Sequence, residues 1–297
     1  LRERARRLRA AALALAVRIF RAEQVVLGGP GGWREVFRDE GLDGTGRRPN
    51  AAFAFVLCGT GFVLYFYGGS WLQSLDVAAG MIASQVLFLV TPAVLACRAI
   101  GAPWRTVFAG RRPSATALVA ALLLGASSWI VLGAPASWLQ NLVLPVPRSV
   151  TEMLREMLGL TRTDVSVWTL LVPFALVPGI CEEVFFRGAV LSGLRARAGK
   201  TTAIVGTALL FGLFHMSVYR VLPTTLIGLL LTWVAWESRS LLAAIVLHAG
   251  HNGMTLIVHK MEWFPRLTGA QDGPFPWSTF AAFAILFAVG VTLLARS

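Results

Sequence analysis

Two adjacent carboxylates begin the first of three patterns whose side chains could do chemistry. Glu182 and Glu183 stand side by side in the run EEVFFR, and Arg187 follows four residues after Glu183. Adjacent residues on a helix point about 100° apart, whereas residues at i and i+4 share a face, so we expect an ion pair between Glu183 and Arg187. This pairing leaves Glu182 on another face, where a buried carboxylate is suited to act as a general base.

Two histidine patterns follow, each with a spacing of four residues. Phe211 and His215 belong to the run FGLFH, and His248 and Asn252 belong to the run HAGHN. If both runs are helical, each pair lies on one helical face. An imidazole can take a proton from water, and an amide can donate a hydrogen bond to a developing oxyanion. Together with Glu182, these residue types fit hydrolysis by an activated water.

The elements that carry these patterns are strongly apolar. Of the 297 residues, 56% are hydrophobic and only 14% are charged. A soluble domain carries about 25% charged residues, so the composition predicts an all-α, polytopic membrane helix bundle. About eight transmembrane helices are expected, at Ala51–Tyr67, Val77–Cys97, Ala115–Gly133, Trp168–Arg197, Thr201–Val218, Leu222–Trp236, Ser240–Val258 and Trp277–Leu294.

Ionisable side chains inside such spans are functional-site candidates, because a charge at the bilayer centre costs roughly 3 kcal/mol or more. At a rise of 1.5 Å per residue, Glu182 and His215 both lie roughly 21–23 Å from the inner ends of their antiparallel spans. His248 and Asn252 lie roughly 12–18 Å from the inner end of theirs. The depths overlap, and we therefore expect the three patterns to meet near mid-membrane.

Charge outside the spans bears on domains and orientation. The net charge is +12, but the basic residues cluster between apolar runs, which favours cytoplasmic loops and lipid contacts over nucleic-acid binding.

We interpret residues 1–48 as a basic juxtamembrane arm and residues 49–297 as the transmembrane bundle. Within the arm we expect a helix over Arg2–Gln24 and a short amphipathic piece near Trp33–Arg38. Ser149–Leu160 has the pattern of an interfacial helix. Most Lys and Arg fall on the side of the amino terminus, which predicts a multi-pass cell-membrane protein with both termini cytoplasmic.

The three cysteines do not suggest a disulfide or a structural metal site. Cys58, Cys97 and Cys181 all lie in apolar segments and show no CxxC spacing. Cys181 precedes Glu182 and could be imagined as a nucleophile. A thiolate is costly in apolar surroundings, however, so we interpret this side chain as a small buried hydrophobe.

The sequence resembles the CPBP family of CAAX-type intramembrane endopeptidases. The resemblance rests on EExxxR, FxxxH and HxxxN, in this order on consecutive membrane helices. The resemblance covers a core at about 168–258, and every motif position is filled. It implies that Glu182 and His215 activate a water for attack on a peptide carbonyl, while His248 and Asn252 donate to the oxyanion. Glu183 and Arg187 support the site, and His251 is an additional imidazole without an assigned role, which we expect at a helix interface.

Two other interpretations of the same residues stay open. Glu182, His215 and His248 could form a two-histidine, one-carboxylate zinc site, although Asn252 is a poor zinc ligand and no HExxH run occurs. We therefore expect no cofactor, with zinc as the alternative. A non-catalytic module associated with a transporter, using the polar cluster as an ion or proton site, is the second alternative.

The partners expected from the sequence are membrane lipid and a peptide or protein substrate, and not nucleic acid. The run RAEQVVLGGP before the first spans is similar to the junction in fusions of ABC-type sodium-efflux permeases with C-terminal CPBP domains. It implies that the chain is the C-terminal part of a longer protein, with such a permease fused or associated. Arginine far outnumbers lysine, which is typical of a GC-rich bacterial genome and argues mildly against prenylated substrates.

Overall fold

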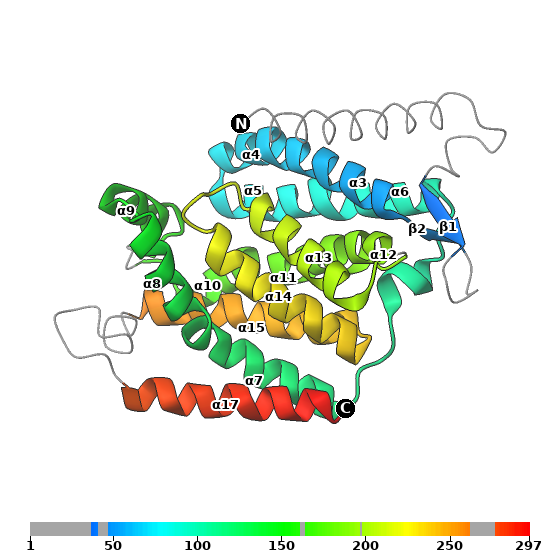
Figure 1. The fold of residues 1–297 in the computed structure, drawn as a ribbon. Helices are drawn as coiled ribbons and strands as arrows, with labels where there is room; N and C mark the ends of the chain where they lie inside the picture. Colours follow the sequence, from blue (N-terminus) through cyan, green and yellow to red (C-terminus); the bar gives the residue numbers. More distant parts are fainter. Residues whose placement is uncertain (1–36, 41–46, 161–163, 197, 262–276) are drawn as a thin grey trace, which may run out of the picture.

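A computed structural model describes residues 37–40, 47–160, 164–196, 198–261 and 277–297, and its long helices lie side by side in one bundle (Figure 1). The predicted polytopic helical fold is confirmed. Seven helical stretches of the described chain are long and apolar enough to cross a membrane: Ala51–Leu75, Val77–Ala99, Ala115–Val143, Val167–Leu194, Val221–Ser238, Leu241–Lys260 and Trp277–Ala295. An eighth apolar helix, Lys200–Phe214, is shorter.

The first three stretches are built from shorter helices. Their bounds are α3 (Ala51–Leu64), α4 (Ser70–Leu75), α5 (Val77–Gln85), α6 (Thr91–Ala99), α7 (Ala115–Val131) and α8 (Gly133–Val143). Side chains cap three of them: Asn50 accepts from the Phe53 amide, Asp76 from Ala79, and Ser114 from Ala117. Each cap satisfies an amide that the first helical turn leaves unpaired, so the helix starts are fixed locally.

The stretch that carries EExxxR is continuous but irregular. It contains α10 (Val167–Leu171), α11 (Val177–Glu183) and α12 (Leu191–Leu194), joined by π-helical segments at Val172–Leu176 and Val184–Val190. Pro173 stands in the first π segment, where the missing amide hydrogen favours a widened turn. Widened turns of this kind are frequent at functional sites, and here they flank the two glutamates.

The remaining helices are α9 (Arg148–Met157), α13 (Lys200–Phe214), α14 (Val221–Ser238), α15 (Leu241–Lys260) and α17 (Trp277–Ala295). Helix α9 corresponds to the predicted interfacial segment Ser149–Leu160. The fifth predicted span, Thr201–Val218, is wrong at its end: α13 stops at Phe214, and Met216 adopts a left-handed φ of 50°. His215 therefore lies at the end of its helix and not within a regular span.

Two short strands were not predicted. Strands β1 (Arg38–Glu40) and β2 (Arg47–Pro49) pair antiparallel, with Arg38 opposite Pro49, just before α3. The expected helix over Arg2–Gln24 lies outside the described residues, as does most of the expected piece near Trp33–Arg38. The proposed division into residues 1–48 and 49–297 stays a prediction.

Close helix contacts hold α15, which carries two of the site residues. Gly125 on α7 lies against the backbone of α15: a Cβ at this position would come within 2.7 Å of the Leu247 carbonyl oxygen. Real Cβ atoms essentially never approach this closely, so the absence of a side chain lets the two helices touch. Because Leu247 directly precedes His248, this contact also fixes the position of that imidazole.

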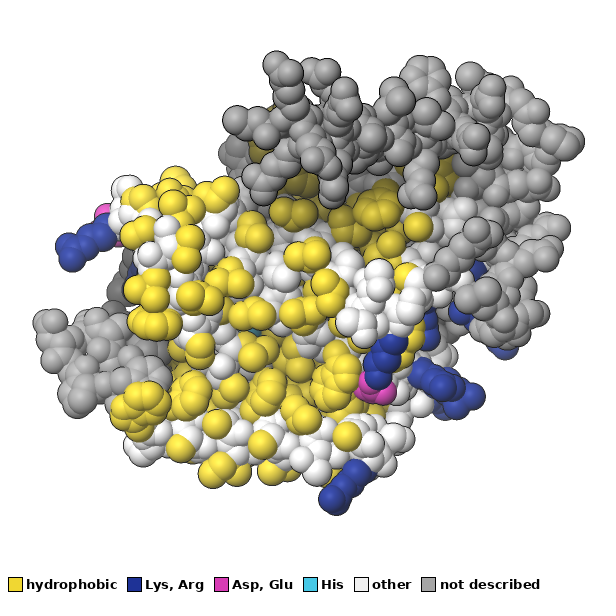
Figure 2. Space-filling view, in the orientation of Figure 1, with side chains coloured by type: hydrophobic (Ala, Val, Ile, Leu, Met, Phe, Trp, Pro, Cys, Tyr) yellow, Lys and Arg dark blue, Asp and Glu magenta, His cyan; other side chains and the backbone are white. Residues whose placement is uncertain are grey.

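The outer faces of the bundle are apolar. Figure 2 shows hydrophobic side chains spread over the visible face, with most of the visible Lys and Arg at the end opposite α9. Large side chains on α3 and α17 are more than half exposed, including Phe55 at 57% and Ile285 at 64%. Such surfaces are disfavoured in water but suit contact with lipid. The cytoplasmic placement of both termini stays a prediction.

Candidate active site

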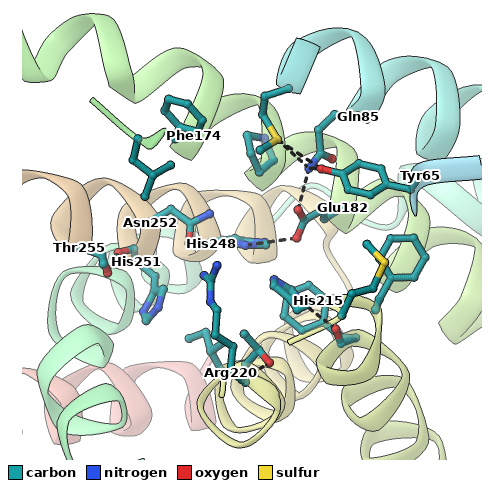
Figure 3. Close-up of a pocket in the computed structure, with 18 of the residues that line it drawn as sticks. Tyr65, Gln85, Phe174, Glu182, His215, Arg220, His248, His251, Asn252 and Thr255 are labelled. Atoms are coloured by element: carbon teal, nitrogen blue, oxygen red, sulfur yellow. Dashed lines mark hydrogen bonds and ion pairs between the residues drawn. The ribbon is translucent and has the colours of Figure 1, made fainter. Parts of the chain in front are cut away.

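The three sequence patterns meet at one pocket of about 350 Å³. Glu182 comes from α11, His215 from the end of α13, and His248 and Asn252 from α15, and all four line the cavity (Figure 3). Met157 and Leu158, at the end of α9, also line it. The three patterns were expected to meet because their depths in the membrane overlap, and they do meet in the structure. The chemical roles of these residues stay predictions.

Glu182 is the carboxylate that faces the pocket. Its side chain is 14% exposed, and its Oε2 lies 3.8 Å from Nε2 of His248. On the other side, Nε2 of Gln85 donates to Oε1 of Glu182 at 2.8 Å. Gln85 is only 1% exposed and belongs to α5, far from the motifs in sequence. An amide donor at this position orients the carboxylate.

Glu183 points away from the pocket into the bundle. Its side chain is 0% exposed, and Oε1 accepts a hydrogen bond from Nη1 of Arg187 at 2.7 Å. The expected ion pair is therefore confirmed. Arg187 also donates from Nε to the Thr232 hydroxyl at 3.2 Å and from Nη2 to the Gly228 carbonyl oxygen at 3.0 Å. One guanidinium thus links the stretch that carries EExxxR to α14, and its structural role stays a prediction.

The same Glu183 also holds His248, a contact that the spacing of the motifs did not predict. Nδ1 of His248 lies 2.7 Å from Glu183 Oε1. A carboxylate that is paired with Arg187 only accepts hydrogen bonds, so Nδ1 carries the proton. The other ring nitrogen, Nε2, then faces Glu182 and has a lone pair in the neutral imidazole. His248 thus lies between two carboxylates with different environments.

His215 shows the same ring orientation by a different route. Its Nδ1 lies 2.9 Å from the Phe211 carbonyl oxygen, which can only accept, so Nε2 again has the free lone pair. The Phe211 ring packs edge to face against the His215 ring, with 4.8 Å between centroids. Phe211 also lies 4.5 Å below the Arg187 guanidinium. Phe211 therefore packs between His215 and the buried ion pair of Glu183 and Arg187.

Asn252 and His251 differ in how they are held. Asn252, one turn after His248, lines the pocket, and its side chain makes no hydrogen bond within the described part of the chain. It is therefore available to a ligand. His251 is bound through Nδ1 to the hydroxyl of Ser128 on α7, at 2.8 Å. Its expected role at a helix interface is confirmed, although it borders the pocket as well.

Sequence reasoning missed Gln85 and Arg220, which also line the pocket. Gln85 is a lone buried amide in an apolar stretch. A polar residue inside such a stretch could have indicated a functional position in the sequence. Arg220 lies outside the three motifs, and its side chain points into the cavity (Figure 3). Cys181 is buried and is not among the lining residues, in agreement with its interpretation as a small hydrophobe.

The zinc alternative requires three ligands within reach of one ion. Within the described residues, no group of three or more His, Cys, Asp or Glu side chains is arranged so that it could hold a metal ion. Glu182, His215 and His248 line one cavity. Within it, Oε2 of Glu182 and Nε2 of His248 face each other directly, 3.8 Å apart. The expectation that the site works without a cofactor stays a prediction.

The fold and the pocket define a class: a polytopic helical membrane protein with a carboxylate–histidine site among its helices. Residues 164–254 match the family model described as type II CAAX prenyl endopeptidase, Rce1-like. The matched segment contains all three motifs and agrees closely with the core expected at about 168–258, so the resemblance to CAAX-type endopeptidases is confirmed for this segment. Comparison with curated proteins and with solved structures found no match. Nothing in these comparisons concerns the expected permease fusion.

Proposed function

We propose that this protein is a CAAX-type intramembrane endopeptidase that hydrolyses a peptide bond of a membrane-associated substrate. The observation that carries the proposal is the environment of Glu182. Its carboxylate is accessible from the pocket, accepts a hydrogen bond from Gln85 and faces Nε2 of His248. The adjacent Glu183 is closed off from the pocket. The family match at residues 164–254 supports the same activity.

In the proposed reaction, Glu182 and His215 take a proton from a water in the pocket as its oxygen attacks the peptide carbonyl carbon. The carbonyl oxygen becomes an oxyanion, which accepts hydrogen bonds from Asn252 and, when the imidazole is doubly protonated, from Nε2 of His248. The carbon–nitrogen bond then breaks, and the proton passes from Glu182 to the departing amine. No covalent enzyme intermediate is required, because water itself is the nucleophile.

The pocket walls support a substrate with apolar groups next to the scissile bond. The cavity is lined by aromatic and methionine side chains: Tyr65, Phe174, Phe214, Met81 and Met216. Aromatic and methionine side chains offer large apolar contact area, and methionine adapts to ligands of different shape. A hydrophobic peptide segment or a lipidated residue fits this wall, and the two can be distinguished experimentally.

The test uses purified protein in lipid nanodiscs and two sets of quenched fluorescent peptides. One set carries a farnesylated cysteine near the C-terminus, and the other carries an unmodified hydrophobic sequence. Mass spectrometry of the products locates the cleaved bond. We expect cleavage of at least one set by the wild type and none by Glu182→Gln. Absence of cleavage of both sets, in protein that is folded and monodisperse, would contradict the proposed function.

The zinc alternative has one observation in its favour. His215 and His248 both use Nδ1 within the protein, which leaves Nε2 as the free nitrogen, as in many metal sites. We nevertheless propose a metal-independent hydrolase, since Asn252 is placed to donate to an oxyanion. The transporter-module alternative, which uses the polar cluster as an ion or proton site, predicts that Glu182→Ala impairs transport-linked function and that the wild type cleaves no peptide. The peptidase proposal predicts a specific loss of cleavage while binding of a membrane partner survives.

A further inference from the structure

The oxyanion needs hydrogen-bond donors, and the ring orientations in the pocket limit which residues can provide them. His248 gives its Nδ1 hydrogen to Glu183, so it donates from Nε2 only as the doubly protonated imidazolium. The His215 ring gives its Nδ1 hydrogen to the Phe211 carbonyl in the same way. Gln85 already uses its amide on Glu182. Of the motif residues, Asn252 alone therefore offers a donor in every protonation state.

Arg220 is a cation in the same pocket, outside all three motifs. It is the one Lys or Arg among the described lining residues, and its guanidinium points into the cavity from the side opposite Asn252 (Figure 3). Within the described residues, its side chain makes no hydrogen bond and no ion pair. A guanidinium stays protonated and carries five N–H donors. Its charge interacts with Glu182 across the pocket, and its N–H donors are available to a further negative group.

We propose that Arg220 is a catalytic residue that donates to the oxyanion together with Asn252. The inference rests on the proposed peptidase function. When water attacks the peptide carbonyl, the carbonyl oxygen takes the bonding electron pair and becomes negative. Arg220 stabilises that charge without giving up a proton. It therefore supplies a charged donor whatever the protonation state of His248. Arg220 is exposed to the pocket, and a charged donor near the place where the oxyanion develops stabilises the transition state.

The local structure allows the side chain to be changed without loss of the fold. Arg220 precedes α14, and its backbone carbonyl accepts from the amide and the hydroxyl of Thr224. These contacts use backbone atoms of Arg220, so substitution of the side chain leaves the start of the helix intact. Arg148, an exposed arginine at the start of α9, is a matched control outside the pocket.

The experiment measures kcat and KM of the full chain in nanodiscs for a peptide that the wild type cleaves. The peptide is made with a free C-terminal carboxylate and with a C-terminal amide. For Arg220→Gln we expect kcat to fall about 10²- to 10³-fold on both peptides with little change in KM, as for the loss of other oxyanion donors. Arg220→Lys keeps the charge and should retain more activity, and Arg148→Gln should match the wild type.

Three results would overturn the inference. One is a folded Arg220→Gln variant with wild-type kcat. Another is a loss in KM alone, confined to the peptide with a free carboxylate, because Arg220 would then anchor the substrate terminus. If Arg220→Gln does not fold, Arg220→Met, which also removes the charge and the donors, decides, and a folded Arg220→Met variant with wild-type kcat is the third result. A wild type that cleaves while Glu182→Gln does not keeps the proposed function intact in each case, whereas an inactive wild type removes both.

Discussion

Glu182 and Glu183 are neighbours in sequence, but they belong to two differently built regions. Behind the pocket, Glu183, Arg187, His248 and Thr232 form a buried polar cluster in which Oε1 of Glu183 has two donors at 2.7 Å. In the pocket, Glu182 has one donor at 2.8 Å and remains 14% exposed. We infer that the two regions have different roles. The buried cluster fixes the helices and the His248 ring, while the pocket stays open for water and substrate.

The largest expected effect on stability comes from breaking the buried cluster. Arg187→Ala leaves Glu183 charged and without its main partner inside the bundle. We expect it to lower the free energy of unfolding by about 3–5 kcal/mol, as for other broken buried pairs. Thermal unfolding in detergent measures this, with Arg98→Ala on the exposed side of α6 as the control. A variant that keeps its stability and loses only kcat would show that Arg187 takes part in the reaction.

A smaller effect, this time on catalysis, is expected from Gln85. Gln85→Met keeps the approximate size of the side chain but removes the amide that donates to Glu182. A hydrogen bond to a charged group contributes roughly 1.5–3 kcal/mol, so we expect kcat to fall about 10- to 100-fold with KM nearly unchanged. Gln140→Met, a buried amide of α8 outside the pocket, is the control. Equal kcat for Gln85→Met and the wild type would remove Gln85 from the site.

His251 tests where the boundary between the two regions lies. It borders the pocket but is held by Ser128 on α7. We expect His251→Leu to lower stability by about 1 kcal/mol, the usual contribution of one hydrogen bond, and to leave kcat within a small factor of the wild type. Parallel unfolding and activity assays check this. A large loss of kcat at unchanged stability would assign His251 to the reaction.

The smallest expected effect is that of a chelator. If Glu182 and His215 activate water without metal, dialysis against EDTA or phenanthroline leaves kcat unchanged, and the purified active protein contains far less than one metal ion per chain. Elemental analysis and activity before and after dialysis provide the measurement. Loss of activity that zinc restores would establish a metalloprotease and reassign His215 and His248 as ligands.

The sequence predicted those parts of the site that depend on helical spacing. The i, i+4 rule was enough for the Glu183–Arg187 pair, and hydropathy was enough for the bundle and the approximate depth of each motif. The contact between Glu183 and His248 joins helices that are 65 residues apart, and no local pattern encodes it. Gln85 is 97 residues from Glu182 and was hidden for the same reason. The early end of α13 depends on backbone geometry at Met216, a residue that sequence alone does not mark as a break.

The most direct test of the account compares Glu182→Gln with Glu183→Gln in one preparation series, measuring kcat and the free energy of unfolding for both. For Glu182→Gln we predict wild-type stability and a loss of kcat of about 10²- to 10⁴-fold or more, because the general base is removed. For Glu183→Gln we predict a loss of several kcal/mol of stability, because Arg187 is left buried without its counter-charge. A stable, inactive Glu183→Gln together with an active Glu182→Gln would contradict the account and exchange the roles of the two carboxylates.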